Sequence, residues 1–264
     1  MLAGGRSSRM GTPKAALEWH GSTLLRRTTG IVARATGGPV VVVRARGQDL
    51  PELPKGTIVT EDPRDGKGPV QGIAAGLSAL REHADVAFVC STDMPFLHPA
   101  FIGRVLSSLK DADVALPVAR GYRQPLAAAY RVALADIAER LVIQDRLKPA
   151  FLFDECRVEQ LDDAALTTAQ DPDLESVVNV NTPDDYEAAR AKQAPEVTVE
   201  LFGTLGRGKR SVRAATLAQA AAAVDLTLDR HITAALNGDQ ITRDAETPLA
   251  SGDTVFFLSA DAGG

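Results

Sequence analysis

Residues 2–14 combine glycines with cationic side chains in a spacing suited to phosphate chemistry. Glycines let backbone N–H groups approach an anion without interference from a Cβ atom, and guanidinium and ammonium groups bind phosphate oxygens. The spacing matches neither GxGxxG nor GxxxxGK[ST], which disfavours a dinucleotide fingerprint and a P-loop. On composition alone, a solvated basic N-terminus explains the segment equally well. The residues concerned are Gly4, Gly5, Arg6, Arg9, Gly11 and Lys14.

Asp93 is the second residue whose setting indicates chemistry. It follows the apolar run Ala84–Cys90, so its carboxylate is expected at the carboxyl end of a buried strand. Mg²⁺ is commonly held there by one or two carboxylates together with phosphate oxygens and water. Taken alone, an Asp two residues before a proline fits a turn or helix cap better. Beside a phosphate-binding loop, we favour a metal ligand.

Composition excludes several other kinds of protein. The net charge is −5 and the pI about 5.5, so no basic field would attract nucleic acid or anionic lipid. The two cysteines, Cys90 and Cys156, form no CxxC pair, which excludes a disulfide scaffold and a cysteine-rich zinc site. No apolar run reaches the roughly 20 residues of a membrane span. With no signal-peptide pattern, we expect a cytoplasmic protein.

The elements that must position these residues alternate along the first two-thirds of the chain. Continuous apolar, β-branched runs predict strands covered on both faces, and longer patterned segments between them predict helices. This alternation predicts a doubly wound, mainly parallel α/β sheet, with ligands at the carboxyl ends of the strands. The predicted strands are 40–43, 57–60, 84–90 and 113–117, and the predicted helices are 22–35, 70–82, 98–110 and 127–141.

A second domain is predicted after residue 193. A closing helix over 184–192 is broken at Pro195, and the alternating segment 196–202 begins a sheet with one exposed face. Strands near 211–214, 232–236 and 254–258 and a helix over 217–224 complete a ββαββ pattern. We therefore expect domains at 1–193 and 196–264, the second being a small α+β domain.

The opening segment LAGGRSSRMGTPK resembles the signature of the MobA-like nucleotidyltransferases. Further segments that resemble this family follow in its order, which makes a chance match improbable. They are Val59–Asp62, Gly68–Gly72, Ser91–Pro95, Gln124–Leu126 and Asn179–Asp184.

The resemblance implies a Mg²⁺-dependent transfer of GMP from GTP to the phosphate of molybdopterin, with release of pyrophosphate. It implies catalytic roles for Arg9, Lys14 and Asp93, with Asp93 holding the metal ion. Gln124, Pro125, Asn179 and Asn181 would face the acceptor. The nucleotide would be bound by Leu2, Ala3, Gly4, Gly5, Met10, Gly11, Lys14, Arg44, Asp62 and Asp93.

Two alternatives stay open. The LAGG form favours GTP, but the Thr12–Lys14 ending also occurs among cytidylyl-type members, so CTP and a cytidylyl- or sugar-phosphate transferase are possible. Arg44 stands where the resemblance implies Asn. The other alternative is a non-catalytic nucleotide-binding scaffold.

Residues 196–264 resemble the MoaD/ThiS sulfur carriers, which have a ubiquitin-like β-grasp fold. The resemblance lies in Ala235–Gly238, Thr247–Val255 and the Gly263-Gly264 end. It implies adenylation and thiocarboxylation of Gly264, with a carrier-activating enzyme and the molybdopterin synthase large subunit as partners. Thiamine-type carriers look similar, so the pathway stays open.

The resemblance also implies a strand of several residues before Leu2. A central parallel strand buries side chains on both faces, and losing one would cost several kcal/mol, roughly a whole domain's stability. We therefore expect that the native chain begins upstream of Met1, which mass spectrometry of the native N-terminal peptide can test.

Overall fold

The computed structural model describes residues 1–4, 13–62, 68–205 and 208–259. By the density of their contacts the residues form two units. Unit 1 comprises Met1–Leu17 and Thr23–Asp185, and unit 2 comprises Glu18–Ser22 and Tyr186–Gly264. Each unit is described by itself.

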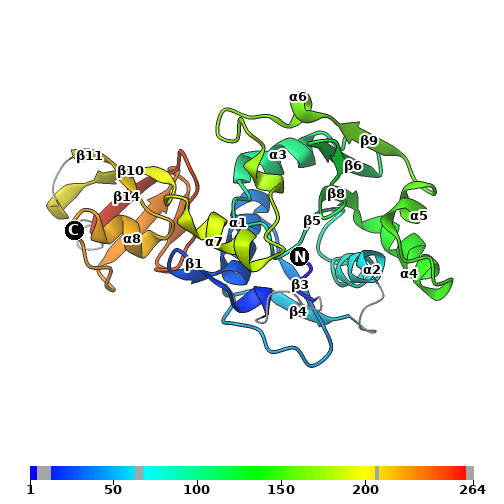
Figure 1. Ribbon diagram of the computed structural model, residues 1–264. Coiled ribbons are helices and arrows are strands. Elements are labelled where there is room, and N and C mark those ends of the chain that lie inside the picture. The colour runs from blue at the N-terminus through cyan, green and yellow to red at the C-terminus, as the bar shows by residue number, and fades with distance from the viewer. Residues whose placement is uncertain (5–12, 63–67, 206–207, 260–264) are drawn as a thin grey trace. The chain divides into compact units, whose positions relative to one another are not determined.

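Unit 1 is built on a parallel pair of strands and a larger sheet of mixed strand direction (Figure 1). Strand β3 pairs parallel with β4, while β8 pairs antiparallel with both β5 and β6. Strand β6 also pairs antiparallel with β7 and parallel with β9. The strands are β3 Val41–Arg44, β4 Ile58–Glu61, β5 Val86–Cys90, β6 Val114–Ala119, β7 Tyr122–Arg123, β8 Ala127–Arg131 and β9 Val158–Leu161.

Leu2 lies between β3 and β5, near the carboxyl ends of these two strands. It forms parallel bridges with Val43 on one side and Ser91 on the other. Its N–H donates to Cys90 O at 2.8 Å, and Val43 N–H donates to Met1 O at the same distance. The start of the chain therefore joins β3 to β5 only at this edge.

Helices pack against these sheets through apolar side chains. The core contains the buried valines of β3 together with Ile73, Leu77 and Leu141 from helices and Tyr130 from β8. The helices are η1 Lys14–Ala16, α1 Leu24–Thr36, α2 Pro69–Ala79, α3 Pro99–Ser107, η2 Val132–Leu134, α4 Ala135–Ile143, α5 Pro149–Phe153, α6 Asp163–Leu166, η3 Glu175–Val177 and α7 Pro183–Ala191, which runs on into unit 2.

The structure confirms an α/β fold and corrects two predictions about it. The sheet is mixed rather than mainly parallel, because β8 runs against both of its neighbours. The helix predicted over 127–141 is also wrong in its first part, since 127–131 form strand β8 and the α-helix begins at Ala135. Alanine favours helices, but the three alanines of β8 are almost fully buried and pair with β5 and β6, so long-range strand pairing overrides the local preference.

A cavity of about 200 Å³ lies beside Met1 in unit 1. It is lined by β3, β5 and the three helices α1, α2 and α3, and its wall is mainly apolar, with Val32, Val41, Leu77, Phe88 and Leu106 among its residues. The terminal ammonium of Met1 is buried here and donates to Val41 O at 2.6 Å. Burial lowers the pKa of this ammonium from its ordinary value.

Unit 2 contains a five-stranded sheet in the order β11-β10-β14-β12-β13. The central pair β10 and β14 is parallel, and the remaining pairs are antiparallel. Helix α8 packs on one face through Leu217, Ala220 and Ala221. The elements are β10 Glu196–Leu201, η4 Gly203–Leu205, β11 Gly208–Arg213, α8 Leu217–Ala222, β12 Ile232–Leu236, β13 Gln240–Thr242 and β14 Thr254–Ser259.

Unit 2 also includes Glu18–Ser22 from early in the chain, which contains β1 Glu18–Trp19 and the first residue of its hairpin partner β2 Ser22–Thr23. Gln219 Nε2 donates to His20 O at 2.8 Å, and Arg190 forms an ion pair with Glu18 at 2.9 Å. The predicted strands of this region are confirmed, whereas β13 was not predicted, because Gln240–Thr242 is too short to show a pattern.

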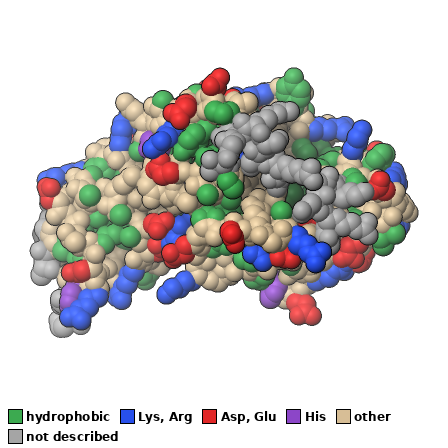
Figure 2. Space-filling view, turned by 60° about the horizontal axis from the view of Figure 1, so that its bottom comes forward, with side chains coloured by type: hydrophobic (Ala, Val, Ile, Leu, Met, Phe, Trp, Pro, Cys, Tyr) green, Lys and Arg blue, Asp and Glu red, His purple; other side chains and the backbone are tan. Residues whose placement is uncertain are grey.

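Among the described residues, no helix is long and apolar enough to cross a membrane. Figure 2 shows acidic and basic side chains interspersed over the face in view.

Candidate active site

The backbone of Leu2–Gly4 is fixed by hydrogen bonds on both sides. The N–H groups of Ala3 and Gly4 donate to Val43 O at 2.8 and 3.2 Å. Thr92 Oγ1 donates to Leu2 O at 3.2 Å, and Gln48 Nε2 donates to Ala3 O at the same distance. The glycine-rich segment therefore starts from a rigid point at the carboxyl ends of β3 and β5.

Two glycines allow this backbone to fit its place. A Cβ atom on Gly4 would lie 3.0 Å from Ala45 N, and one on Gly72 would lie 2.7 Å from the Leu2 side chain. The first is a backbone contact that cannot yield easily. The absence of a side chain at Gly4 therefore lets the chain approach Ala45 closely. The N–H of Gly4 donates to Val43 O of β3.

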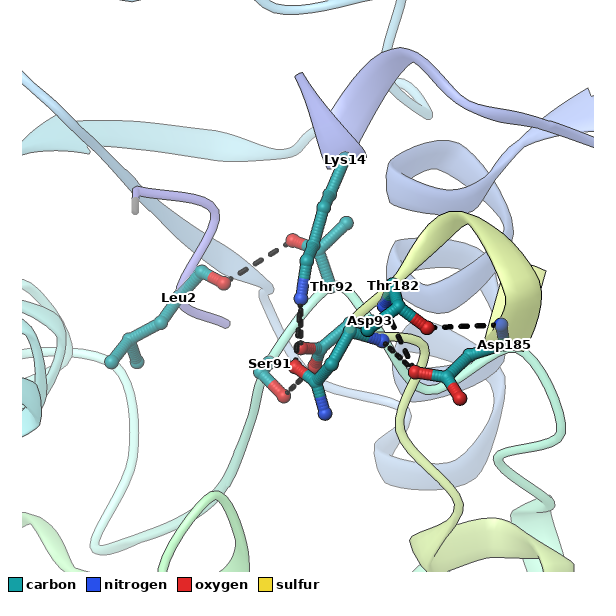
Figure 3. A network of polar contacts seen from close by, with 8 residues as sticks. Leu2, Lys14, Ser91, Thr92, Asp93, Thr182 and Asp185 are labelled. Carbon is teal, nitrogen blue, oxygen red and sulfur yellow. Dashed lines mark hydrogen bonds and ion pairs between the residues drawn. The ribbon is translucent and has the colours of Figure 1, made fainter. Parts of the chain in front are cut away.

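Lys14 and Asp93 converge from distant parts of the chain (Figure 3), and Asn181 contacts the same ammonium. Lys14 Nζ lies 2.9 Å from Asp93 Oδ2 and 2.9 Å from Asn181 Oδ1. The Lys14 side chain is 22% exposed and that of Asp93 17%, so the ion pair is shielded yet open to a ligand. Lys14 is placed by η1, whose Ala15 is buried against unit 1.

Asp93 accepts hydrogen bonds through both its side chain and its backbone. Ser91 Oγ donates to Asp93 Oδ1, and Val180 N–H donates to Asp93 O at 2.9 Å. Both carboxylate oxygens of Asp93 therefore have partners, one a hydroxyl and one the ammonium of Lys14.

The segment that carries Asn181 is held by the first turn of α7. Asp185 Oδ2 accepts from the N–H groups of Asn181 and Thr182 at 3.0 and 2.9 Å. Thr182 Oγ1 accepts from Asp185 N–H at 3.2 Å. These hydrogen bonds, with a smaller contribution from the Lys14 charge, lower the pKa of the Asp185 carboxyl.

A second group of polar side chains surrounds the end of β3. Arg44 contacts Glu61 at 2.8 Å and donates to Gln48 O at 3.1 Å. Gln48 Oε1 accepts from Ala45 N–H at 2.9 Å, which closes the turn. Asp62 follows β4, and its carboxylate accepts from the side chain of Gln71 at the start of α2.

Comparison with known proteins identifies the family to which this site belongs. Residues 1–158 match the family model described as the MobA-like NTP transferase domain. The chain belongs to this family. It is a nucleotidyltransferase, similar to the probable molybdenum cofactor guanylyltransferases of Mycobacterium avium and Mycobacterium bovis.

The first relative is 35% identical over 199 residues, which cover 74% of this chain and 95% of the relative. The second is 40% identical over 159 residues, or 58% of this chain and 77% of the relative. Among solved structures, the molybdopterin-guanine dinucleotide biosynthesis protein A of Archaeoglobus fulgidus is 25% identical, with a TM-score of 0.57 over 72% of this chain and 94% of that one. The 2-C-methyl-D-erythritol 4-phosphate cytidylyltransferase of Thermus thermophilus shares the fold, at 20% identity and a TM-score of 0.53 over 72% of this chain and 96% of that one.

The MobA-like domain brings only some of the predicted site residues together. Lys14, Asp93 and Asn181 are in contact, and Leu2–Gly4 is tied to Thr92 beside Asp93. Arg44 and Asp62 lie together at the ends of β3 and β4, since Asp62 N–H donates to Arg44 O at 2.7 Å. The predicted residues Gly5, Arg9, Met10, Gly11 and Gly264 lie outside the described residues.

Gln124 and Pro125 lie in the turn between β7 and β8 of the MobA-like domain. Gln124 N–H donates to Pro117 O, and Pro125 O accepts from Tyr130 Oη. Burial raises the pKa of the Tyr130 hydroxyl, so this group donates a hydrogen bond and stays protonated. These contacts anchor the turn and do not include the Lys14–Asp93 pair.

Four residues of this arrangement were not predicted: Gln48, Ser91, Thr92 and Asp185. Ser91 and Thr92 lie inside the segment 91–95 and could have been inferred from their place beside Asp93. Asp185 completes a Thr-x-x-Asp pattern that resembles a capping box. Gln48 has no local signal, because its partner Ala3 is 45 residues away.

Proposed function

We propose that this enzyme transfers GMP from GTP to the phosphate of molybdopterin and releases pyrophosphate. The observation that carries the proposal is the convergence of Lys14, Asp93 and Asn181 beside the start of the glycine-rich segment. The names of the mycobacterial relatives supply the nucleotide and the acceptor.

The donors around Asp93 fit a magnesium ion. The carboxylate of Asp93, the amide oxygen of Asn181 and the hydroxyl of Ser91 are hard oxygen donors, which Mg²⁺ prefers. Bound at Asp93, the ion would offset negative charge on the phosphates.

The reaction needs little from the protein besides position and charge. In nucleotidyl transfer, an acceptor phosphate oxygen attacks the α-phosphorus in line as the bond to pyrophosphate breaks. Lys14 stabilises the charge that develops on the phosphates. Arg9, from the glycine-rich segment, helps to stabilise this charge, and Asn179 and Asn181 hold the acceptor.

Guanine selection is assigned to the group at the ends of β3 and β4. Guanine presents N–H donors on its Watson–Crick edge, and the carboxylate of Asp62 is a suitable acceptor for them. Arg44 is engaged by Glu61 and by Gln48 O, so we assign it to shaping this pocket together with the Leu2–Gly4 backbone.

For unit 2 we propose a β-grasp fold and a role as a sulfur carrier for the same pathway. The parallel central pair β10 and β14, flanked by antiparallel strands and covered by one helix, supports the fold. The role rests on the resemblance around Ala235–Gly238 and on the Gly-Gly end. Its partners would be a carrier-activating enzyme and the molybdopterin synthase large subunit.

The transferase proposal is tested by measuring pyrophosphate release with each of GTP, CTP, ATP and UTP, with and without molybdopterin. We expect release with GTP that depends on molybdopterin. Asp93→Ala should lower kcat by about 100-fold or more, because it removes the charge that holds the metal ion, while circular dichroism stays unchanged. Preference for CTP would indicate a cytidylyltransferase, and an unchanged rate in Asp93→Ala would indicate a scaffold.

A further inference from the structure

Asn181 contacts Lys14 through its side chain and Asp185 through its backbone N–H. The side chain of Asn181 is exposed, and its amide oxygen contacts Lys14 from a segment without regular structure. The backbone of this segment is fixed at two points. Val180 N–H donates to Asp93 O, and the N–H groups of Asn181 and Thr182 both donate to Asp185 Oδ2 (Figure 3).

Asp185 does more than begin a helix. In a capping box, the third helical residue accepts from the N–H of the cap residue, here Thr182. Asp185 also accepts from the residue before the cap, which is Asn181. One carboxylate oxygen thereby fixes two successive peptide groups and sets the direction in which the Asn181 side chain leaves the chain.

The charge of Asp185 is maintained by the same contacts. Hydrogen bonds from Asn181 and Thr182 lower the pKa of its carboxyl, so it is ionised at neutral pH. A charged acceptor forms stronger hydrogen bonds than a neutral one.

We propose that Asp185 is a positioning residue of the active site, which acts through the backbone of Asn181 to hold its carboxamide against Lys14 and Asp93. This inference rests on the proposed transferase function for its kinetic consequence. Its structural part, the fixed direction of Asn181, stands apart from any reaction.

Asp184 provides a matched control. It precedes Asp185 in the first turn of α7, is also exposed and carries the same charge. Asp184→Asn and Asp185→Asn therefore remove equal charge from the same helix end. Thr182→Ala is a second control. It removes the hydroxyl that accepts from Asp185 N–H but retains the hydrogen bond from Asn181 N–H to the Asp185 carboxylate.

The kinetic test compares these variants in the wild-type and Asn181→Ala backgrounds. We expect Asp185→Asn to lower kcat for pyrophosphate release by about tenfold, equivalent to roughly 1.4 kcal/mol, with KM for GTP changed much less. Asp184→Asn and Thr182→Ala should change kcat less than about threefold, although loss of a cap hydroxyl lowers Tm. Asp185→Glu keeps the carboxylate and should restore most of kcat.

Combining the Asp185 and Asn181 substitutions tests whether Asp185 acts through Asn181. If Asp185 acts through Asn181, Asp185→Asn should have almost no further effect on kcat once Asn181 is alanine. An equal loss in both backgrounds, or equal losses from Asp184→Asn and Asp185→Asn, would overturn the proposal.

A readout without catalysis separates failure of this proposal from failure of the transferase function. In ¹⁵N-labelled protein, the Asn181 side-chain amide signal is identified by its absence in Asn181→Ala. It should keep its position in Asp184→Asn and move to the position of a freely rotating amide in Asp185→Asn. An unmoved signal refutes the positioning role, whereas a wild-type protein inactive with every nucleotide refutes the transferase function alone.

Discussion

The ammonium of Lys14 lies between two oxygen atoms that a divalent cation could also bind. It is 2.9 Å from both Asp93 Oδ2 and Asn181 Oδ1. A magnesium ion binds oxygen at about 2.0–2.1 Å, and two cations that share one carboxylate oxygen repel each other. At the proposed metal site, Lys14 and a divalent cation would therefore compete for Asp93 until phosphates offered Lys14 another anionic partner.

Replacing Lys14 by methionine should separate its two roles. Without nucleotide, Lys14→Met is expected to bind Mn²⁺ about tenfold more tightly, because the competing charge is absent, which corresponds to roughly 1.4 kcal/mol. Its affinity for GTP should fall by at least as much, since an ammonium–phosphate contact is lost. Electron paramagnetic resonance measures the first and calorimetry the second.

Two variants serve as controls for this prediction. Lys14→Arg retains the charge and should leave Mn²⁺ affinity low. Lys148→Met removes an exposed lysine from elsewhere in unit 1 and should change neither affinity. Unchanged Mn²⁺ binding in Lys14→Met would show that Lys14 does not compete for Asp93.

Leu2, at the start of the chain, bridges the carboxyl ends of strands β3 and β5. Beyond Met1 the space between them is the apolar cavity of about 200 Å³, and the charged terminus is buried at its end. An extended segment placed there could pair with both strands and bury its side chains between helices. The cavity therefore has the lining and strand neighbours that suit a central strand.

Adding Val-Ile-Val before Met1 should stabilise unit 1. Each buried Val or Ile contributes about 1.5–3 kcal/mol, offset by about 1–2 kcal/mol of backbone entropy per ordered residue. Each kcal/mol of net gain raises Tm by about 2–4 °C in a protein of this size. Thermal unfolding followed by circular dichroism measures the change.

A Gly-Ser-Gly extension controls for loss of the buried charge at Met1. Because burial lowers the pKa of the Met1 ammonium below its usual 8.0, the unfolded chain binds this proton more readily, and the stability of the unextended chain should rise as pH approaches 8. Both extensions should remove this contribution, but only the apolar one should raise Tm further. Equal Tm values for the two extensions would show that the cavity does not accept a strand.

The division of the chain into two units restricts where the chain can be truncated, because residues 18–22 belong to unit 2. Unit 2 holds the hairpin of residues 18–22 through Gln219, Arg190 and the Ser22–Glu246 contact, and Trp19 is 2% exposed. A chain cut after residue 193 would therefore remove partners of this hairpin. Small changes at the C-terminus test the proposed carrier role without that disturbance.

Deleting Gly264 should abolish thiocarboxylation by a carrier-activating enzyme and ATP, because the acceptor carboxylate would be displaced by one residue. Pyrophosphate release by the transferase should persist, because every residue proposed for the transfer belongs to unit 1. Mass spectrometry detects the thiocarboxylate through its sulfur atom. Thiocarboxylation that persists after the deletion contradicts the carrier role.

Strands and helices that depend on a local side-chain pattern can be predicted from the sequence. Side-chain period and β-branched composition predict strands at three places. The structure has strands there, which are the buried valines of β3, the run that ends at Cys90 and most of the alternating segment 196–202. Asp93 and Lys14 were chosen from the sequence, and the structure places their side chains in contact.

Elements and contacts that depend on partners distant in the chain are seen only in the tertiary structure. Ala127–Arg131 is a strand because it lies between β5 and β6, although alanine favours helices. Gln48 donates to Ala3 O, and Asp185 accepts from the N–H of Asn181, so both contacts use backbone groups that nearly every residue type possesses. Such contacts leave little trace in the spacing of side chains, because a peptide N–H or C=O looks the same at every position of a sequence.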